Sequence, residues 1–66
     1  MAVVKVIEII AESTESWEAA VQDAVTEAAK TVDGLQTAYV QDFQAILEGN
    51  KIVKYRVNVK ISFIVK

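Results

Sequence analysis

Strict alternation of apolar and polar positions marks the last third of the chain. From Val53 to Val65 every second residue is apolar, over thirteen residues, and most residues between them are charged or polar. Side chains of a β-strand point alternately to the two faces of a sheet, so this pattern predicts a long strand with one buried face. Glu48-Gly49-Asn50 precedes it and indicates a turn.

Two other segments have the composition of strands. Residues 3–11 are rich in β-branched side chains at both odd and even positions, which predicts a strand that is apolar on both faces. Residues 35–47 contain tyrosine, valine and phenylalanine but alternate imperfectly, and we interpret them as a further strand. The turn signal then joins this strand to the last one as an antiparallel hairpin.

A helical period separates the first two strands and predicts a helix from about Thr14 to Val32. Ser13 is the expected N-cap, Glu15 favours the positive end of the helix dipole, and Gly34 fits a left-handed helix end. The apolar residues at spacings of three and four are Trp17, Ala20, Val21, Ala24, Ala28 and Val32. So many alanines in one stripe allow close approach to a sheet, and we expect Trp17 in the core.

The element order is therefore β-α-β-β, in one domain over residues 1–66. The longest and most regular strand is the natural centre of the sheet, which favours strand order 2-3-1 with antiparallel neighbours. The sequence thus predicts an α+β fold in which a three-stranded antiparallel sheet wraps around one helix.

Composition changes this picture in one respect, because the chain has few means of stabilising itself alone. Of 66 residues 53% are apolar, which excludes disorder, but none is cysteine or histidine. Disulfides, most zinc and haem sites and nearly all Ser-His or Cys-His catalytic arrangements are thereby excluded. A last strand of about 46 Å also exceeds the ~28 Å of the helix beneath it. We therefore predict a symmetric homo-oligomer without enzymatic activity.

Charge is segregated along the chain. Residues 1–50 carry a net charge of −7 and residues 51–66 carry +5, the latter from Lys51, Lys54, Arg56, Lys60 and Lys66. This basic strand either binds an anionic ligand or is a solvated face that balances acidic neighbours. Tyr55 and Phe63 fall on the opposite, buried face, so nucleic-acid binding is not expected. No signal peptide or membrane span is evident, and a cytoplasmic protein is expected.

The residues then show a family resemblance. Lys5-Val6-Ile7-Glu8-Ile9-Ile10-Ala11-Glu12-Ser13, followed by Ser16-Trp17-Glu18-Ala19-Ala20, resembles the opening of the dodecins. Thr31-Val32-Asp33 and the strand from Tyr55-Arg56-Val57 to Phe63 extend the resemblance over essentially the whole chain. It implies a hollow homododecamer that binds flavins such as FMN, riboflavin or FAD between subunits.

The resemblance also implies site residues. Thr37 stands where flavin-binding dodecins carry a tryptophan that stacks on the isoalloxazine ring, and Arg56 stands where they carry a glutamine. Gln36 and Tyr39 lie near Thr37, and Tyr39 is a candidate substitute for the missing aromatic surface. The expected cofactor-binding residues are therefore Thr37, Arg56, Gln36 and Tyr39, although the same residues could equally line a subunit contact.

Three functions stay open. The first is a flavin-binding storage protein. The second is a dodecin-like shell that holds another anionic small molecule, such as a nucleotide or coenzyme, or metal ions. The third is a purely structural assembly. Five acids near the first strand and the helix could gather around calcium across subunits or could be solvated, and any metal site stays unknown: Glu8, Glu12, Glu15, Glu18 and Asp23.

Overall fold

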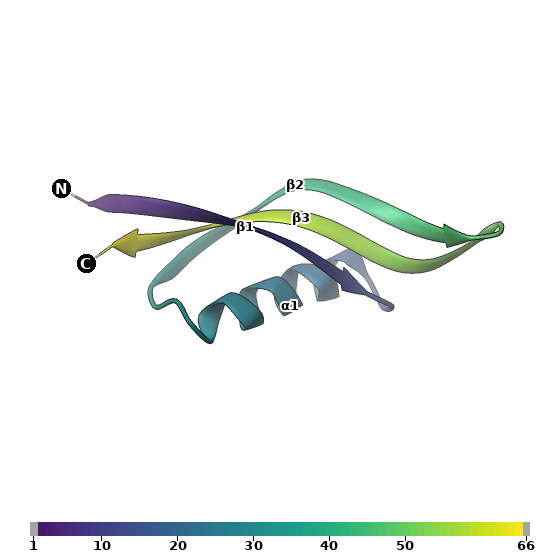
Figure 1. Cartoon of the computed structure of the whole chain (residues 1–66), viewed down its shortest axis with the longest axis horizontal. Helices are drawn as coiled ribbons and strands as arrows, with labels where there is room; N and C mark the ends of the chain where they lie inside the picture. The colour runs from purple at the N-terminus through teal and green to yellow at the C-terminus, as the bar shows by residue number, and fades with distance from the viewer. Residues whose placement is uncertain (1, 66) are drawn as a thin grey trace.

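The computed structural model describes residues 2–65 as one antiparallel sheet covered on one side by a helix (Figure 1). The elements are β1 (Val3–Ser13), α1 (Trp17–Ala29), β2 (Leu35–Glu48) and β3 (Lys51–Val65). The strand order is β1-β3-β2, with both neighbours of β3 antiparallel to it. This confirms the predicted fold class and the central position of the last strand. Lys66, counted above in the basic segment, lies outside the described residues.

The core is small and lies between α1 and the centre of the sheet. Six of the described residues are buried: Ala20, Ala24 and Ala28 from α1, and Val57, Val59 and Ile61 from β3. Ile7, Ile9 and Ala11 of β1 pack against them and are partly buried. Alanine leaves room for the helix backbone to approach the sheet, while the β-branched residues of β3 fill the space opposite. The predicted alternation of β3 is therefore confirmed, with its odd-numbered residues facing α1.

The imperfect alternation of β2 has a structural cause. Its pairing with β3 shifts register between Leu35 and Thr37, again between Val40 and Asp42, and at the end of the strand. An extra residue in one strand moves the side chains that follow to the opposite face. Thr37 and Tyr39 therefore lie on the face away from α1, and beyond the second bulge the even-numbered residues, such as Gln44, take over that face.

The helix is shorter than predicted at both ends. Ser13 is still paired with Tyr55 in the sheet, so the predicted N-cap is wrong. Ser16 is the N-cap instead, with an extended backbone and a side chain that accepts a hydrogen bond of 3.0 Å from the Ala19 N–H. Gly34 has a positive φ of 75°, as its left-handed assignment requires, but it follows the helix end at Ala29 by several residues and leads into β2.

Trp17, expected in the core, lies half-buried at its edge as the first residue of α1. Its ring packs edge-to-face against Phe43, at 5.3 Å between centroids, and against Tyr55, at 4.9 Å. The indole Nε1–H donates a 3.0 Å hydrogen bond to the backbone carbonyl of Gln44. Trp17 thus ties the start of the helix to both strands of the β2–β3 hairpin.

The chain is elongated, with principal extents of 50 × 20 × 13 Å. Its radius of gyration of 13.5 Å exceeds the ~11 Å expected of a compact domain of this length. β1 ends opposite Tyr55, so residues 46–54, called here the hairpin arm, extend past both β1 and α1 (Figure 1). On this arm Leu47 is 61% exposed and Ile52 53% exposed.

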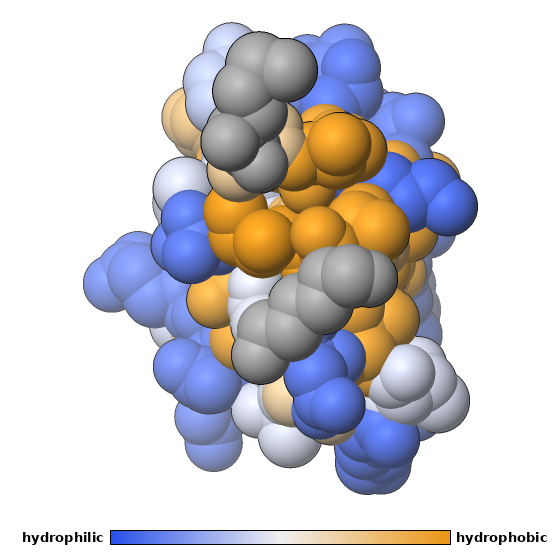
Figure 2. Space-filling view, turned by 90° about the vertical axis from the view of Figure 1, so that its left-hand side faces the viewer, coloured by the Kyte–Doolittle hydropathy of each residue, from blue (hydrophilic) through white to orange (hydrophobic). Residues whose placement is uncertain are grey.

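The opposite end of the sheet, where both termini lie, is also apolar at its surface (Figure 2). Val3, Val4 and Val65 are among the exposed large apolar residues there. The outer surface of β1 is apolar as well, because Val6 and Ile10 face away from the helix. The prediction of a first strand with two apolar faces is therefore confirmed.

Candidate functional site

The face of the sheet away from α1, called here the outer face, carries most of the polar strand residues. Antiparallel pairing arranges them in rows across three strands. One row joins Glu12, Arg56 and Gln44, and the next joins Ile10, Asn58 and Asp42. Directly opposed residues on one face of a sheet have Cβ atoms about 5 Å apart, so each row is a set of contacting side chains.

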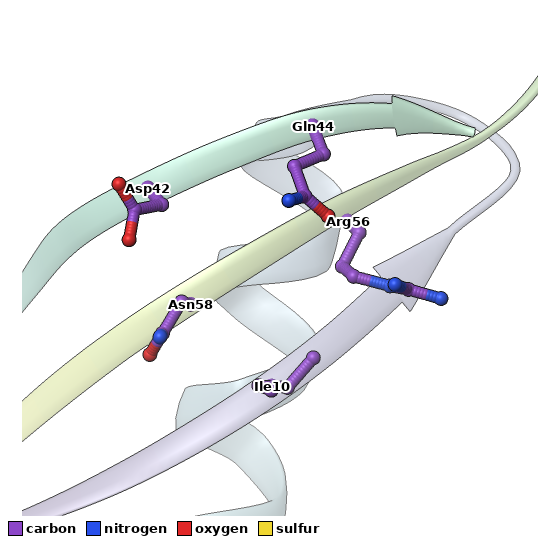
Figure 3. Close-up of a pocket in the computed structure, with 5 residues that line it drawn as sticks. All are labelled: Ile10, Asp42, Gln44, Arg56 and Asn58. Carbon is purple, nitrogen blue, oxygen red and sulfur yellow. The ribbon is translucent and has the colours of Figure 1, made fainter.

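A pocket of about 230 Å³ lies on these two rows (Figure 3). The residues that line this outer-face pocket are Ile10, Asp42, Gln44, Arg56 and Asn58. Four of the five are polar, and Ile10 supplies an apolar surface. Pockets for small organic ligands usually measure about 300–1,000 Å³. The pocket of one chain is therefore smaller than a typical small-molecule site.

Arg56 is held at the edge of this pocket by Glu12. Its Nε–H donates a 2.7 Å hydrogen bond to Glu12 Oε2, and its Nη2 lies 2.6 Å from the same oxygen. Lys54 Nζ lies 3.7 Å from the other carboxylate oxygen. The hydrogen bond from Arg56, together with the positive charges of Arg56 and Lys54, lowers the pKa of the Glu12 carboxyl from its usual 4.5. Glu12 is therefore ionised at neutral pH and pairs with both cations.

The pocket also offers hydrogen-bond acceptors. Asn58 Oδ1 is buried and has no hydrogen-bond partner among the described residues. Asp42, on the neighbouring strand, forms no ion pair within residues 2–65. Gln44 adds an amide that both donates and accepts. The pocket can accordingly bind a flat, polar edge that presents N–H and C=O groups side by side.

The predicted site residues all occur on β2 and β3, but one chain does not bring them together. Thr37 lies opposite Ser62, and their hydroxyl groups hydrogen-bond to each other. Six residues of β3, or roughly 20 Å, separate that row from Arg56. Gln36 and Thr37 line a second, smaller pocket near Val25 of α1, with a volume of about 180 Å³.

Tyr39 faces the outer side opposite Lys60 and is 64% exposed. It shares the outer face with Thr37, as expected from their spacing, and lies between the Thr37 row and the outer-face pocket. Within one chain a single ring system does not span the roughly 20 Å between Thr37 and Arg56. The assignment of Thr37, Gln36, Tyr39 and Arg56 to a cofactor site therefore stays a prediction.

Sequence reasoning did not identify Asp42, Gln44 and Asn58 as pocket residues. Gln44 bears directly on the resemblance, because it places an amide beside Arg56, where flavin-binding dodecins carry a glutamine in the third strand. The only signal was the polar character of Asp42 and Gln44, which they share with Gln36, Thr37 and Gln41 of the same segment. The bulge after Val40 hides the face on which they lie, so spacing alone gave no indication.

The acids that could have gathered around calcium do not do so within one chain. Among residues 2–65 no group of three or more carboxylates is close enough to hold a metal ion. Glu8 lies opposite Lys60, and Glu12 forms ion pairs with Arg56 and Lys54. In the same part of the chain, α1 is too short and too polar to cross a membrane.

Comparison with known proteins identifies the fold. A crystal structure of an arginine-to-alanine variant of Thermus thermophilus dodecin superposes with a TM-score of 0.93 at 27% identity, covering 100% of this chain and 98% of that chain. The dodecin of Streptomyces coelicolor gives 0.92 at 25% identity, covering 98% of this chain and 93% of that one.

A relative from Mycobacterium tuberculosis, calcium dodecin, is 36% identical over 63 residues, or 96% of this chain and 89% of the relative. Its crystal structure, described as having a novel calcium-binding site, superposes with a TM-score of 0.84 at 34% identity and covers 97% of this chain and 91% of that one. The sequence model of the family named Dodecin matches residues 3–66. The chain therefore belongs to the dodecin family.

Proposed function

We propose that this protein is a non-enzymatic binding protein that holds a flavin on the outer face of its sheet, where neighbouring copies of the chain meet. The observation that carries the proposal is the outer-face pocket with its acceptors and amide. The pyrimidine edge of a flavin ring presents an N–H between two carbonyls, which complements Gln44 and Asn58. The absence of histidine and cysteine from the sequence agrees with a role in holding rather than converting the ligand.

Assembly into a twelve-subunit shell is part of the proposal. The pocket of one chain is small, and Ile10, which lines it, is 65% exposed. Contact with a second copy would bury this surface and enlarge the pocket to the volume a ring system needs. A cytoplasmic location also stays a prediction, which cell fractionation with a specific antibody would test.

The test is equilibrium dialysis of the purified protein against riboflavin and FMN, with bound flavin measured by absorbance. Absorbance is preferable to fluorescence quenching because Thr37 offers no aromatic ring to quench the flavin. Binding with a dissociation constant in the micromolar range, at a fixed ratio of flavin to chain, is the expected result. No binding at high micromolar flavin would contradict the proposal.

Thr37→Trp tests whether Thr37 shares the site. A stacking ring is worth roughly 1–3 kcal/mol per base in comparable nucleic-acid complexes, so flavin affinity should rise about 5- to 150-fold. Thr26→Trp, on an exposed position of α1, is the matched control and should leave the affinity unchanged. An equal effect of both variants would exclude Thr37 from the site. The double variant Thr37→Trp/Arg56→Gln should keep the increased flavin affinity.

Calcium is the second candidate ligand, because the 36% identical relative is a calcium dodecin. The carboxylates of one chain do not form a cluster in the described residues, so a calcium site would need acids from at least two copies. Dialysis of EDTA-treated protein against Ca²⁺, with metal content measured by mass spectrometry, separates the two candidates. Stoichiometric calcium without flavin binding would favour calcium.

A further inference from the structure

The direction of the Arg56 side chain decides which charges face the outer-face pocket. Figure 3 shows the guanidinium extending toward the end of β1 and away from Asp42 and Asn58. Two of its nitrogens contact the same oxygen of Glu12, at 2.7 and 2.6 Å. In the structure these short, charge-assisted contacts hold the side chain in this orientation. Glu12 thereby draws the positive charge of Arg56 to the rim.

The other polar residues of the pocket attract hydrogen-bond donors and repel anions. Asp42 contributes a carboxylate without an ionic partner among residues 2–65. Asn58 contributes a buried oxygen that lacks a hydrogen-bond partner in the same residues. A buried acceptor of this kind favours a ligand that brings an N–H group to it. With Arg56 paired to Glu12, no unpaired positive charge balances Asp42 among the residues that line the pocket.

We propose that Glu12 is a specificity-determining residue: by holding Arg56 at the rim, it makes the outer-face pocket select uncharged ligands with N–H donors over phosphorylated ones. The inference rests on the proposed function, and it specifies unphosphorylated riboflavin over FMN. A phosphate group would have to compete with the Glu12 carboxylate for Arg56, and it would meet the Asp42 carboxylate in a pocket whose lining residues include no other cation. Glu12 acts through Arg56 and does not itself touch the ligand.

The experiment compares riboflavin and FMN affinities, by equilibrium dialysis near neutral pH, for the natural protein and for Glu12→Gln. The natural protein should bind riboflavin at least as tightly as FMN. Glu12→Gln keeps the size of the side chain but frees the charge of Arg56, so the affinity for FMN relative to riboflavin should rise about tenfold or more. An unchanged ratio would overturn the inference.

Glu8→Gln is the matched control. Glu8 lies on the same strand and the same face as Glu12, but opposite Lys60, and its replacement changes net charge by the same amount. The ratio of FMN to riboflavin affinity should change in Glu12→Gln only. An equal change in both variants would indicate a general effect of net charge and would also overturn the inference.

Inorganic pyrophosphate provides a readout that does not depend on flavin binding. Isothermal titration should show tighter pyrophosphate binding by Glu12→Gln than by the natural protein or Glu8→Gln. The gain should disappear in the double variant Glu12→Gln/Arg56→Gln, because it requires the freed guanidinium. If this pattern appears while neither flavin binds any variant, the control of Arg56 by Glu12 is supported and the proposed flavin function is contradicted. If all four proteins bind pyrophosphate equally, the inference fails whatever the flavin result.

Discussion

At the scale of single residues, Glu12 and Arg56 show how much depends on strand register. They are 44 positions apart in the sequence and meet because antiparallel pairing of β1 with β3 places them in one row. The charge segregation along the chain predicted that the basic strand would either meet acidic neighbours or bind anions. For Arg56 and Lys54 the acidic neighbour is Glu12. At this row of one chain, the basic residues therefore balance an acidic neighbour.

This pairing predicts a pH dependence of stability. The pKa of Glu12 is lower in the folded chain than its usual 4.5, so the ionised carboxylate stabilises the folded state above that pH. The contribution is lost as pH falls through the lowered pKa and both states become protonated. Urea unfolding from pH 7 down to pH 3 should show the natural protein more stable than Glu12→Gln at neutral pH, with the two curves converging in acid. A constant difference over this range would contradict the prediction.

Trp17 supports a second prediction at this scale. Trp17→Phe keeps an aromatic ring against Phe43 and Tyr55 but removes the hydrogen bond to the Gln44 carbonyl. The expected loss is about 1 kcal/mol in the free energy of unfolding, the usual net value of one such bond. Circular dichroism during urea unfolding measures it without relying on tryptophan fluorescence. A loss below about 0.3 kcal/mol would mean that this bond adds nothing to stability.

At the scale of elements, the alanine stripe of α1 sets the distance between helix and sheet. Ala24 is 1% exposed, and Ala24→Leu would insert a larger side chain between α1 and the β-branched residues of β3. Overpacking of this kind usually costs about 1–3 kcal/mol. The same substitution at exposed Ala29 should change stability by no more than about 0.5 kcal/mol. Thermal unfolding of both variants, monitored by circular dichroism, makes the comparison.

The elements also show where prediction from sequence succeeds and where it stops. β3 was predictable because its alternation is unbroken, and the helix was predictable from its stripe of small residues. The first residue of the helix was not predictable, because Ser13 and Ser16 are both good N-caps. Only the pairing of Ser13 with Tyr55 in the sheet excludes Ser13. The pocket was hidden for a related reason: bulges in β2 change which side chains face outward, and the imperfect alternation of this segment does not show at which residue the change occurs.

At the scale of the whole molecule, the chain leaves too much apolar surface exposed for an isolated monomer. Only six apolar residues among residues 2–65 are buried, while large apolar side chains are exposed at the terminal end, on the outer face of β1 and on the hairpin arm. Exposed patches of this extent usually mark protein interfaces. The mismatch between strand and helix lengths, which suggested oligomerisation from sequence, is larger in the structure because α1 has only 13 residues. These exposed surfaces therefore predict assembly with further copies of the chain.

The hairpin arm offers the sharpest test of that assembly. Leu47→Glu places a charge on an exposed apolar position that no residue of the same chain needs for its core. If the arm docks on a neighbouring copy, the buried charge should disrupt the particle, because an unpaired carboxylate is costly to desolvate. Light scattering after size exclusion should give about 88 kDa for twelve natural chains of 7.3 kDa, and a much smaller mass for the variant.

Thr26→Glu, which adds the same charge on the solvent side of α1, is the control and should leave the particle intact. Circular dichroism of the dissociated Leu47→Glu chain at low temperature would show whether the sheet survives alone. Because the proposed flavin site lies between copies of the chain, loss of the particle should abolish flavin binding even where that sheet is preserved. A Leu47→Glu protein that stays fully assembled would show that the arm is not part of the interface. One that dissociates yet binds flavin with unchanged affinity would place the whole ligand site within a single chain.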